Sequence, residues 1–277
     1  VREGEVFGLI GTNGAGKSTL LRLACGVFKP DDGLAIVDNM PVYDNVHAKA
    51  KLFFIADEPY FFNGATPKDM ERYYSSVYRN FDRERFYLYL NSFGLESRRR
   101  ISTFSKGMKK QLAILLGLSA KTEYLLCDET FDGLDPVMRQ SVKSIFAKEM
   151  QERQFTPVIA SHNLRELEDL CDQVGLLHGG HILFQRELDQ LRCDFAKIQF
   201  AARPLPSREQ LAQLFPIISM HSSGSIAEMV VRGNPIQIQQ KLSVFHPLLC
   251  ETVPLTLEEI FITEMEAVGY DYNNVIF

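Results

Sequence analysis

The chain has 277 residues, of which 45% are hydrophobic and 23% are charged, and its net charge is −5. This composition indicates a globular protein with a sizeable core, and the longest apolar run, residues 112–118, is far shorter than the roughly 20 residues that cross a bilayer. The acidic balance argues against a basic surface that would attract a phosphate backbone, so we expect no nucleic-acid partner.

The first predicted elements are a strand over residues 6–10, a glycine-rich loop and a helix. The loop fits the pattern Gly-x-x-x-x-Gly-Lys-Ser, which ends at Lys17 and Ser18. Glycines let backbone N–H groups turn toward an anion, and the N-terminal end of the next helix adds positive charge. We therefore expect Lys17 to reach the β- and γ-phosphates of a nucleotide and Ser18 to bind Mg²⁺. The expected phosphate-binding residues are Asn13, Gly14, Ala15, Gly16, Lys17, Ser18 and Thr19.

Three more short apolar runs, at residues 52–56, 124–128 and 156–160, alternate with helical patterns. Such alternation is typical of an α/β protein with a parallel sheet wrapped by helices. Ligands of such sheets bind at the carboxyl ends of the strands, so the polar residues that follow these runs are candidates for the site.

The region between Thr66 and Ala120 has helical spacing and no strand pattern, which predicts an inserted all-helical subdomain over about residues 64–120. Its Tyr and Phe residues are expected to form the core of this subdomain, with docking of a partner as the alternative. A helix is predicted to start at Ser105. The Ser105 hydroxyl and the Gly107 backbone would make a second anion-binding surface, and the alternative is an ordinary capped helix.

Two carboxylates stand at the end of the run 124–128. Asp128 is its last residue and Glu129 follows it. Asp128 is expected to hold Mg²⁺, and Glu129 is expected to polarise the attacking water as a general base. The alternative is a strand that runs into an acidic turn. His162 also lies at a strand end, after the run 156–160, as Asp128 does in its strand. We therefore expect it to contact the γ-phosphate rather than to play only a structural role.

After Leu191 the pattern changes to short strands and capped helix starts, at Ser207, Asn234 and Thr256. This change predicts two domains, a nucleotide-binding domain over residues 1–191 and a small α+β accessory domain over residues 196–277. Five cysteines are scattered without a Cys-x-x-Cys pair, so we expect buried, reduced thiols in a cytoplasmic protein. They are Cys25, Cys127, Cys171, Cys193 and Cys250.

The phosphate loop, "FSKGM", "YLLCDE", "FDGLDP" and "SHN" occur in the order and spacing of the ATP-binding cassette (ABC) ATPases, which residues 3–190 therefore resemble. The resemblance implies a P-loop NTPase cassette whose two copies pair head to tail around ATP. Ser105 and Gly107 would then serve the nucleotide held by the opposite copy. The resemblance also makes Glu129 the catalytic base and His162 the switch histidine, and Asp135 matches a loop that communicates across the dimer.

The chain departs from the family pattern at three places, one of which is that no residue in 1–7 matches the aromatic residue that stacks adenine in the family. The signature carries Lys106 and ends in Met108 rather than glutamine, both familiar in bacterial ABC-2-type exporters. Asp57 stands where the family has the glutamine of the Q-loop, which touches Mg²⁺ and couples to the membrane domain. We therefore place Asp57 with Ser18 and Asp128 as expected metal ligands, although a carboxylate cannot donate a hydrogen bond as an amide does.

The pattern is similar to that of ABC-2-type exporters such as bacitracin-resistance and antimicrobial-peptide exporters. We therefore expect an ATP-hydrolysing nucleotide-binding subunit that uses ATP and Mg²⁺ and powers an exporter by ATP-driven dimerisation. Its expected partners are transmembrane permease subunits and a second nucleotide-binding subunit, in a homodimer or a heterodimer. Its expected location is the cytoplasm, on the inner face of the cell membrane. The alternatives are a soluble ABC-type ATPase that acts on ribosomes or DNA, and a regulatory module that binds ATP without hydrolysis.

Overall fold

The computed structural model describes residues 1–267, except for the side chains of residues 192–194 and 263–267. It divides the chain between Gln185 and Arg186 into two units, each with its own sheet. The helix α8 (Leu188–Asp194) falls in the second unit, whereas the composition places the change of pattern after Leu191. A short helix after a strand is also typical of an α/β unit. The change in sequence pattern therefore lies a few residues after the division between the two units.

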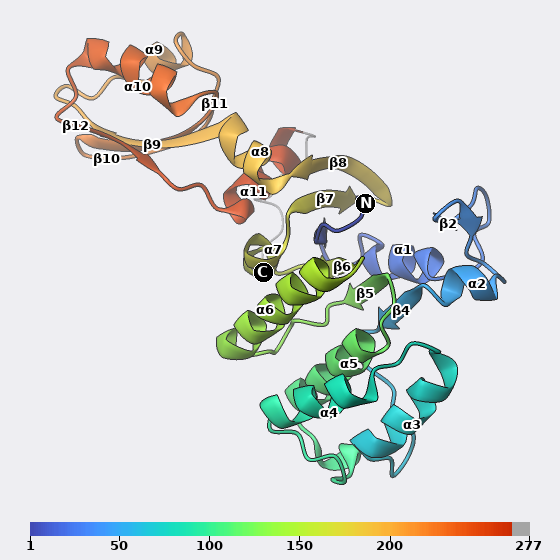
Figure 1. Cartoon of the computed structure of the whole chain (residues 1–277). Coiled ribbons are helices and arrows are strands. Elements are labelled where there is room, and N and C mark those ends of the chain that lie inside the picture. The colour runs from blue at the N-terminus through green and yellow to red at the C-terminus, as the bar shows by residue number, and fades with distance from the viewer. Residues whose placement is uncertain (268–277) are drawn as a thin grey trace. The chain divides into compact units, whose positions relative to one another are not determined.

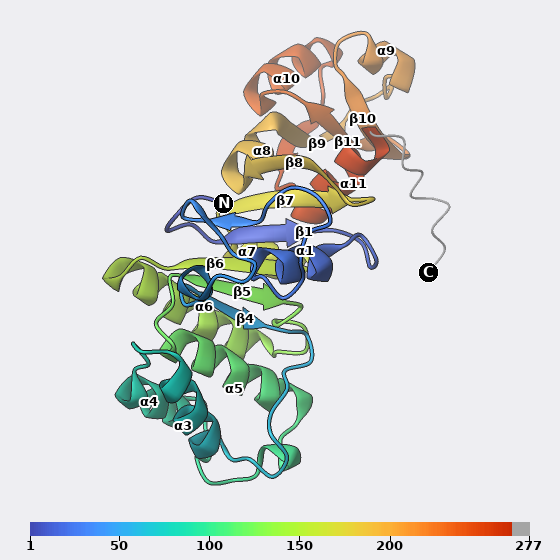
Figure 2. The ribbon, with the colours of Figure 1, turned by 90° about the vertical axis from the view of Figure 1, so that its right-hand side faces the viewer.

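A six-stranded sheet forms the centre of the first unit, in the order β4-β5-β6-β1-β7-β8 (Figures 1 and 2). Strands β4, β5, β6, β1 and β7 run parallel to one another. This order confirms the predicted α/β sheet, and it brings the carboxyl ends of β1, β5 and β6 to one edge. The strands are β1 (Phe7–Ile10), β4 (Leu52–Ile55), β5 (Tyr124–Asp128), β6 (Thr156–Ser161), β7 (Gln173–His178) and β8 (His181–Glu187).

Helices cover both faces of this sheet because successive strand residues point to opposite sides. On one face, Leu126 of β5 packs in a core with Leu21 of α1 and Ala48 of α2. On the other face, α5 (Lys106–Ser119) approaches so closely that a Cβ on Gly117 would lie 2.7 Å from Leu125 Cδ1. The core helices are α1 (Lys17–Ala24), α2 (Val46–Lys49), α6 (Pro136–Glu152) and α7 (Leu164–Leu170), and a short pair, β2 (Ile36–Val37) and β3 (Met40–Pro41), lies outside the main sheet.

The predicted helical insertion is confirmed, since residues 64–120 contain helices and no strand (Figure 1). Thr66 and Asp69 form a reciprocal capping box with Pro67 at the first helical position, and Asp82 and Ser105 cap the next two α-helices. The elements are α3 (Pro67–Val77), α4 (Arg83–Ser92), η1 (Ile101–Thr103) and α5 (Lys106–Ser119).

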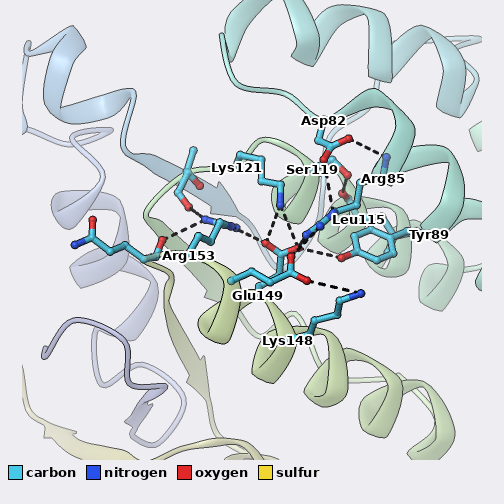
Figure 3. Close-up of polar contacts among 12 residues, drawn as sticks. Asp82, Arg85, Tyr89, Leu115, Ser119, Lys121, Lys148, Glu149 and Arg153 are labelled. Carbon is cyan, nitrogen blue, oxygen red and sulfur yellow. Dashed lines mark hydrogen bonds and ion pairs between the residues drawn. The ribbon is translucent and has the colours of Figure 1, made fainter.

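A buried carboxylate, Glu149 of α6, joins this helical region to the sheet unit (Figure 3). Its side chain has no exposed surface and forms ion pairs with Arg85 of α4, Lys121 and Arg153. It also accepts a hydrogen bond from the Tyr89 hydroxyl at 3.0 Å. Burial alone would raise the pKa of Glu149, but the hydrogen bonds from Arg153 and Arg85 outweigh it and lower the pKa to about 2.

This lowered pKa predicts a loss of stability in acid. Because the pKa of Glu149 falls from 4.5 to about 2 on folding, the charged form contributes stability above about pH 4.5, and this contribution disappears as the pH falls toward 2. The shift corresponds to about 3 kcal/mol of unfolding free energy. Urea unfolding between pH 6 and pH 3 should therefore show a steeper loss for the native chain than for Glu149→Gln. Parallel pH dependence in the two proteins would contradict the role of this carboxylate.

The second unit contains a four-stranded antiparallel sheet in the order β10-β11-β9-β12, which confirms the predicted C-terminal α+β region. Ile198 and Phe200 of β9 and Met229 of β11 are buried in its core. On Lys197, the ammonium lies 2.7 Å from Glu259 and 3.0 Å from Glu228. The remaining elements are β9 (Phe195–Ala201), α9 (Arg208–Ala212), β10 (Ile217–Ser223), β11 (Ile226–Arg232), α10 (Pro235–Leu242), η2 (Ser243–Phe245), β12 (Leu249–Val253) and α11 (Leu257–Ala267).

The cysteines are free thiols where the structure describes them. Cys25, Cys127 and Cys171 are buried and Cys250 is half-buried, and burial raises the pKa of all four thiols. Cys193 lies outside the described side chains. A raised pKa keeps a thiol protonated, so these residues behave as small apolar groups rather than as nucleophiles.

Candidate functional site

The glycine-rich loop turns between β1 and α1 with two glycines in the left-handed region. Gly14 has φ +81° and Gly16, the N-cap of α1, has φ +105°. A side chain at either position would strain the backbone. Gly11 is needed for a different reason, because a Cβ there would lie 2.6 Å from the Leu177 carbonyl oxygen of β7. The loop therefore fits closely over the sheet edge and leads into the positive end of α1.

Lys17 is the first residue of α1 and is only 5% exposed. Its ammonium donates hydrogen bonds to the carbonyl oxygens of Gly11 at 2.7 Å and Thr12 at 3.3 Å. It also lies 3.3 Å from a carboxylate oxygen of Glu129. The loop thus holds the cation beside oxygen atoms, and phosphate oxygens suit the same position.

Ser18 and Asp128 meet although 110 residues separate them in the chain. The Ser18 hydroxyl donates to Asp128 at 2.9 Å. Burial raises the pKa of Asp128, the bond from Ser18 lowers it, and the charge of Glu129 raises it further. A divalent cation at this point would stabilise the charged carboxylate, and a hydroxyl and a carboxylate are the oxygen ligands that Mg²⁺ prefers.

These two residues fit a metal that is completed by substrate oxygens. Among the described residues, no cluster of three or more His, Cys, Asp or Glu is arranged to hold a metal ion. Mg²⁺ in phosphate sites usually takes one or two protein ligands together with water and phosphate oxygens. Ser18 and Asp128 satisfy that smaller requirement.

Glu129 turns away from the strand direction because it adopts a left-handed backbone conformation, with φ +46°. Its N–H donates to the Ala160 carbonyl oxygen at 2.9 Å. Its carboxylate lies 2.9 Å from Nδ1 of His162 and accepts a hydrogen bond from the His162 N–H at 3.3 Å. The side chain of His162 is 46% exposed. The two residues therefore form a pair with one face open to solvent.

A second carboxylate, Glu166 of α7, supports the loop that carries His162, and the sequence analysis missed it. It is 3% exposed and accepts a hydrogen bond from the Asn163 amide at 3.1 Å, and its carboxylate lies 3.3 Å from Arg139. Burial raises its pKa, and the charge of Arg139 opposes that shift. The helix contains several acidic residues, so its sequence pattern did not single out Glu166.

Asp57 lies beside Lys110, another residue that the sequence analysis missed. The two side chains are 3.0 Å apart, and the Lys110 ammonium also donates to the Glu129 carbonyl oxygen at 2.6 Å. Lys110 is 1% exposed, whereas the Asp57 side chain is 48% exposed. The available signal was the position of Lys110 on α5, three residues before the buried Ala113 and four before Ile114, which places a charge on the apolar face.

Ser105 and Gly107 lie at the N-terminus of α5. The Ser105 hydroxyl accepts a hydrogen bond from the Met108 N–H at 3.2 Å. A Cβ on Gly107 would lie 3.4 Å from the Gly133 carbonyl oxygen, so this end of α5 packs beside the "FDGLDP" turn. Asp135 caps α6 with a 2.9 Å bond from the Met138 N–H. The structure thus groups Lys17, Ser18, Asp128, Glu129 and His162 by direct contacts, while Gly107 packs beside the Gly133 turn.

An aromatic cavity of about 440 Å³ opens between the loop after Asp57 and the helical region. Its lining includes Pro59, Tyr60 and Phe62 from the loop and Tyr73 from α3. The rings of Phe62 and Tyr73 meet edge to face with centroids 5.0 Å apart, and Tyr60 is 75% exposed. Part of the aromatic stripe predicted as core therefore lines an open surface.

In the described part of the chain, no helix has the length and apolar character needed to cross a membrane.

The chain is similar to known ATP-binding proteins of ABC transporters. A family described as ABC transporter matches residues 1–132. The ABC transporter ATP-binding protein YtrB of Bacillus subtilis is 27% identical over 264 residues, which cover 95% of this chain and 90% of YtrB. The bacitracin transport ATP-binding protein BcrA of Enterococcus faecalis is 29% identical over 194 residues, which cover 69% of this chain but only 63% of BcrA. Among solved structures, the dimeric ATP-binding cassette MJ0796, in a post-hydrolysis state with ADP and Pi, has a TM-score of 0.61 at 22% identity and covers 68% of this chain and 87% of that chain.

Proposed function

We propose that this chain, which is similar to the ATP-binding proteins of ABC transporters, is the subunit that binds and hydrolyses ATP to drive an exporter. The observation that carries the proposal is the convergence of five polar residues at one sheet edge. Lys17 and Ser18 start α1, Asp128 and Glu129 end β5, and His162 follows β6. They are linked by contacts of 2.9 to 3.3 Å.

In this proposal the phosphate loop and Lys17 bind the phosphates of ATP. The loop N–H groups and the end of α1 favour an anion, and Lys17 adds a full charge. Ser18 and Asp128 hold Mg²⁺, which neutralises charge on the phosphates when it is bound. Asp128 is buried and the charge of Glu129 helps to raise its pKa, so a nearby cation would stabilise its charged form.

Glu129 is the general base of the proposed reaction. Water attacks the γ-phosphorus, the bond to the β-phosphate oxygen breaks, and the proton of the water passes to the Glu129 carboxylate. The products are ADP and inorganic phosphate. His162 contacts Glu129 at 2.9 Å and has a half-exposed ring, so it can contact the γ-phosphate from the same edge. Binding of phosphate to Lys17 also releases Glu129 from its ion pair with that cation.

A second copy or a related chain completes the proposed site. Ser105 and Gly107 form an anion-binding helix start that lies by the Gly133 turn rather than among the phosphate-loop residues. In a head-to-tail dimer, this helix start serves the nucleotide bound by the opposite cassette. The solved cassette MJ0796 is itself described as dimeric and bound to ADP and Pi.

Membrane permease subunits are the proposed partners, and the inner face of the cell membrane in the cytoplasm is the proposed location. BcrA is described as a bacitracin transport protein, which supports a role in export. The aromatic cavity between the Asp57 loop and α3 offers an open apolar surface for a segment of the permease. The compound that is exported is then chosen by the membrane subunits.

Purification of the native complex tests the transporter role. Affinity purification from detergent-solubilised membranes is expected to recover a polytopic membrane protein, identified by mass spectrometry. Replacing Tyr60 and Phe62 with serine removes two aromatic contacts. If these contacts contribute roughly 1.4 kcal/mol of binding energy, recovery of the membrane protein should fall by about tenfold. ATP affinity should stay unchanged.

A matched control is Tyr43→Ser, because Tyr43 is also an exposed aromatic residue, at 45%, and lies outside the cavity lining. It should leave the recovery intact. A chain that is found with ribosomes or without any membrane partner would contradict the transporter role, while the ATPase assignment would stand on hydrolysis alone.

A further inference from the structure

We propose that Lys110 is a positioning residue for hydrolysis, because its ammonium joins Asp57 to the backbone of the general base Glu129. Asp57 then acts as the counter-ion of Lys110 rather than as the Mg²⁺ ligand that the family resemblance implies. This inference rests on the proposed ATPase function and deepens it, since it concerns the same site.

Burial makes the partners of Lys110 necessary. The side chain is 1% exposed, and an ammonium in such a place needs hydrogen bonds and an opposite charge. The structure supplies both, with the Glu129 carbonyl oxygen at 2.6 Å and the Asp57 carboxylate at 3.0 Å. A lysine on the apolar face of α5 is therefore held in one position by these two groups.

The bond to the Glu129 carbonyl oxygen acts on the base through its backbone. The residue has φ +46°, a conformation that costs energy for a side chain other than glycine. Its N–H is bound by Ala160 at 2.9 Å and its carbonyl oxygen by Lys110. Hydrogen bonds therefore fix both backbone polar groups of Glu129, and the fixed backbone directs its carboxylate toward Lys17 and His162.

The bond to Asp57 links this arrangement to the aromatic cavity. Asp57 lies near the start of the loop that continues to Pro59, Tyr60 and Phe62, and these three residues line the cavity. If the loop moves, the Asp57 carboxylate withdraws and the buried ammonium loses its opposite charge. A single ion pair therefore connects the position of the loop to the position of the general base.

The test compares Lys110→Met, Asp57→Asn and the double variant in the full chain. Methionine fills the volume of the lysine without its charge, and the half-exposed Asp57 can then be hydrated, so the variant is expected to fold. Lys109→Met is the matched control, because Lys109 precedes Lys110 on the same helix. The readouts are kcat, the affinity for ATP, the Mg²⁺ concentration at half-maximal activity and the melting temperature.

We expect Lys110→Met to lower kcat about 10- to 100-fold, the scale of a base displaced by about 1 Å. Asp57→Asn should lower kcat about fivefold, and the double variant should resemble Lys110→Met because the two residues act as one unit. ATP affinity, Mg²⁺ dependence and melting temperature should stay close to those of the native chain, as should every property of Lys109→Met.

Three results would overturn the inference. The first is native kcat in Lys110→Met. The second is a several-fold rise in the Mg²⁺ requirement of Asp57→Asn alone, which would make Asp57 a metal ligand. The third is multiplication of the two single effects in the double variant. Absence of hydrolysis in the native chain would instead contradict the proposed ATPase function, so the two failures are distinguishable.

Discussion

Replacing Glu129 with glutamine is expected to abolish ATP hydrolysis and to trap an ATP-bound dimer. Glutamine has nearly the same shape and keeps the contact with His162, but its amide cannot accept the proton of the attacking water. Loss of a general base lowers the rate about 10²- to 10⁴-fold. In the proposed function, ATP is bound by the phosphate loop, Lys17 and the residues proposed to hold Mg²⁺, so ATP binding should persist.

Two measurements on the Glu129→Gln variant check this expectation. Phosphate release should fall to the background of the assay, and size-exclusion chromatography with ATP and Mg²⁺ should show a dimer that the native chain forms only transiently. Glu96→Gln is the control, because Glu96 is an exposed glutamate in the loop before η1. Full activity in Glu129→Gln would show that another group takes the proton.

Replacing Glu149 with glutamine or methionine is expected to destabilise the sheet unit and its helical insertion by about 3 to 5 kcal/mol. The reason is the charge that remains. Arg85, Lys121 and Arg153 all point at the buried carboxylate, and its removal leaves these cations without their shared partner. Glutamine keeps a hydrogen-bond acceptor, so its loss should lie at the lower end of the range.

Urea unfolding followed by circular dichroism measures this loss. Glu152→Gln is a matched control on the same helix, because Glu152 also pairs with Arg85, at 2.8 Å, but its side chain is 40% exposed. An exposed pair contributes about 0 to 1 kcal/mol, so this variant should unfold nearly as the native chain does. Equal effects at the two positions would show that burial of Glu149 is not what makes it important.

Local sequence signals predicted much of the fold. The helix starts at Ser105, Ser207 and Asn234 were predicted because an N-cap residue and the residues just after it form a local signal. The four parallel strands β1, β4, β5 and β6 were visible as apolar runs, since buried strands have no polar face. The sequence analysis missed strand β10. Its last three residues, 221–223, are exposed and polar, and its pairing with β11 is irregular near Ile217.

The sequence predicted which residues form the candidate site, but it predicted fewer of the contacts between them. The roles of Lys17, Ser18, Asp128, Glu129 and His162 remain predictions, and the structure brings these residues within hydrogen-bond reach of one another. Ser105 and Gly107 remain predicted ligands of a nucleotide held by another chain. No local pattern connects Asp57 with Lys110, because 53 residues separate them and only the packing of α5 on the sheet brings them together.

By itself, the sequence determined four parallel strands, the helical insertion, the glycine loop and the polar residues at strand ends. These features depend on neighbouring residues, through backbone sterics, capping and hydrophobic periodicity. Only the tertiary structure decided that Glu129 is bound through its backbone by Lys110 and that Glu149 holds three cations. Charges can be buried only where partners from distant segments meet them, and those meetings are set by the packing of whole helices on the sheet.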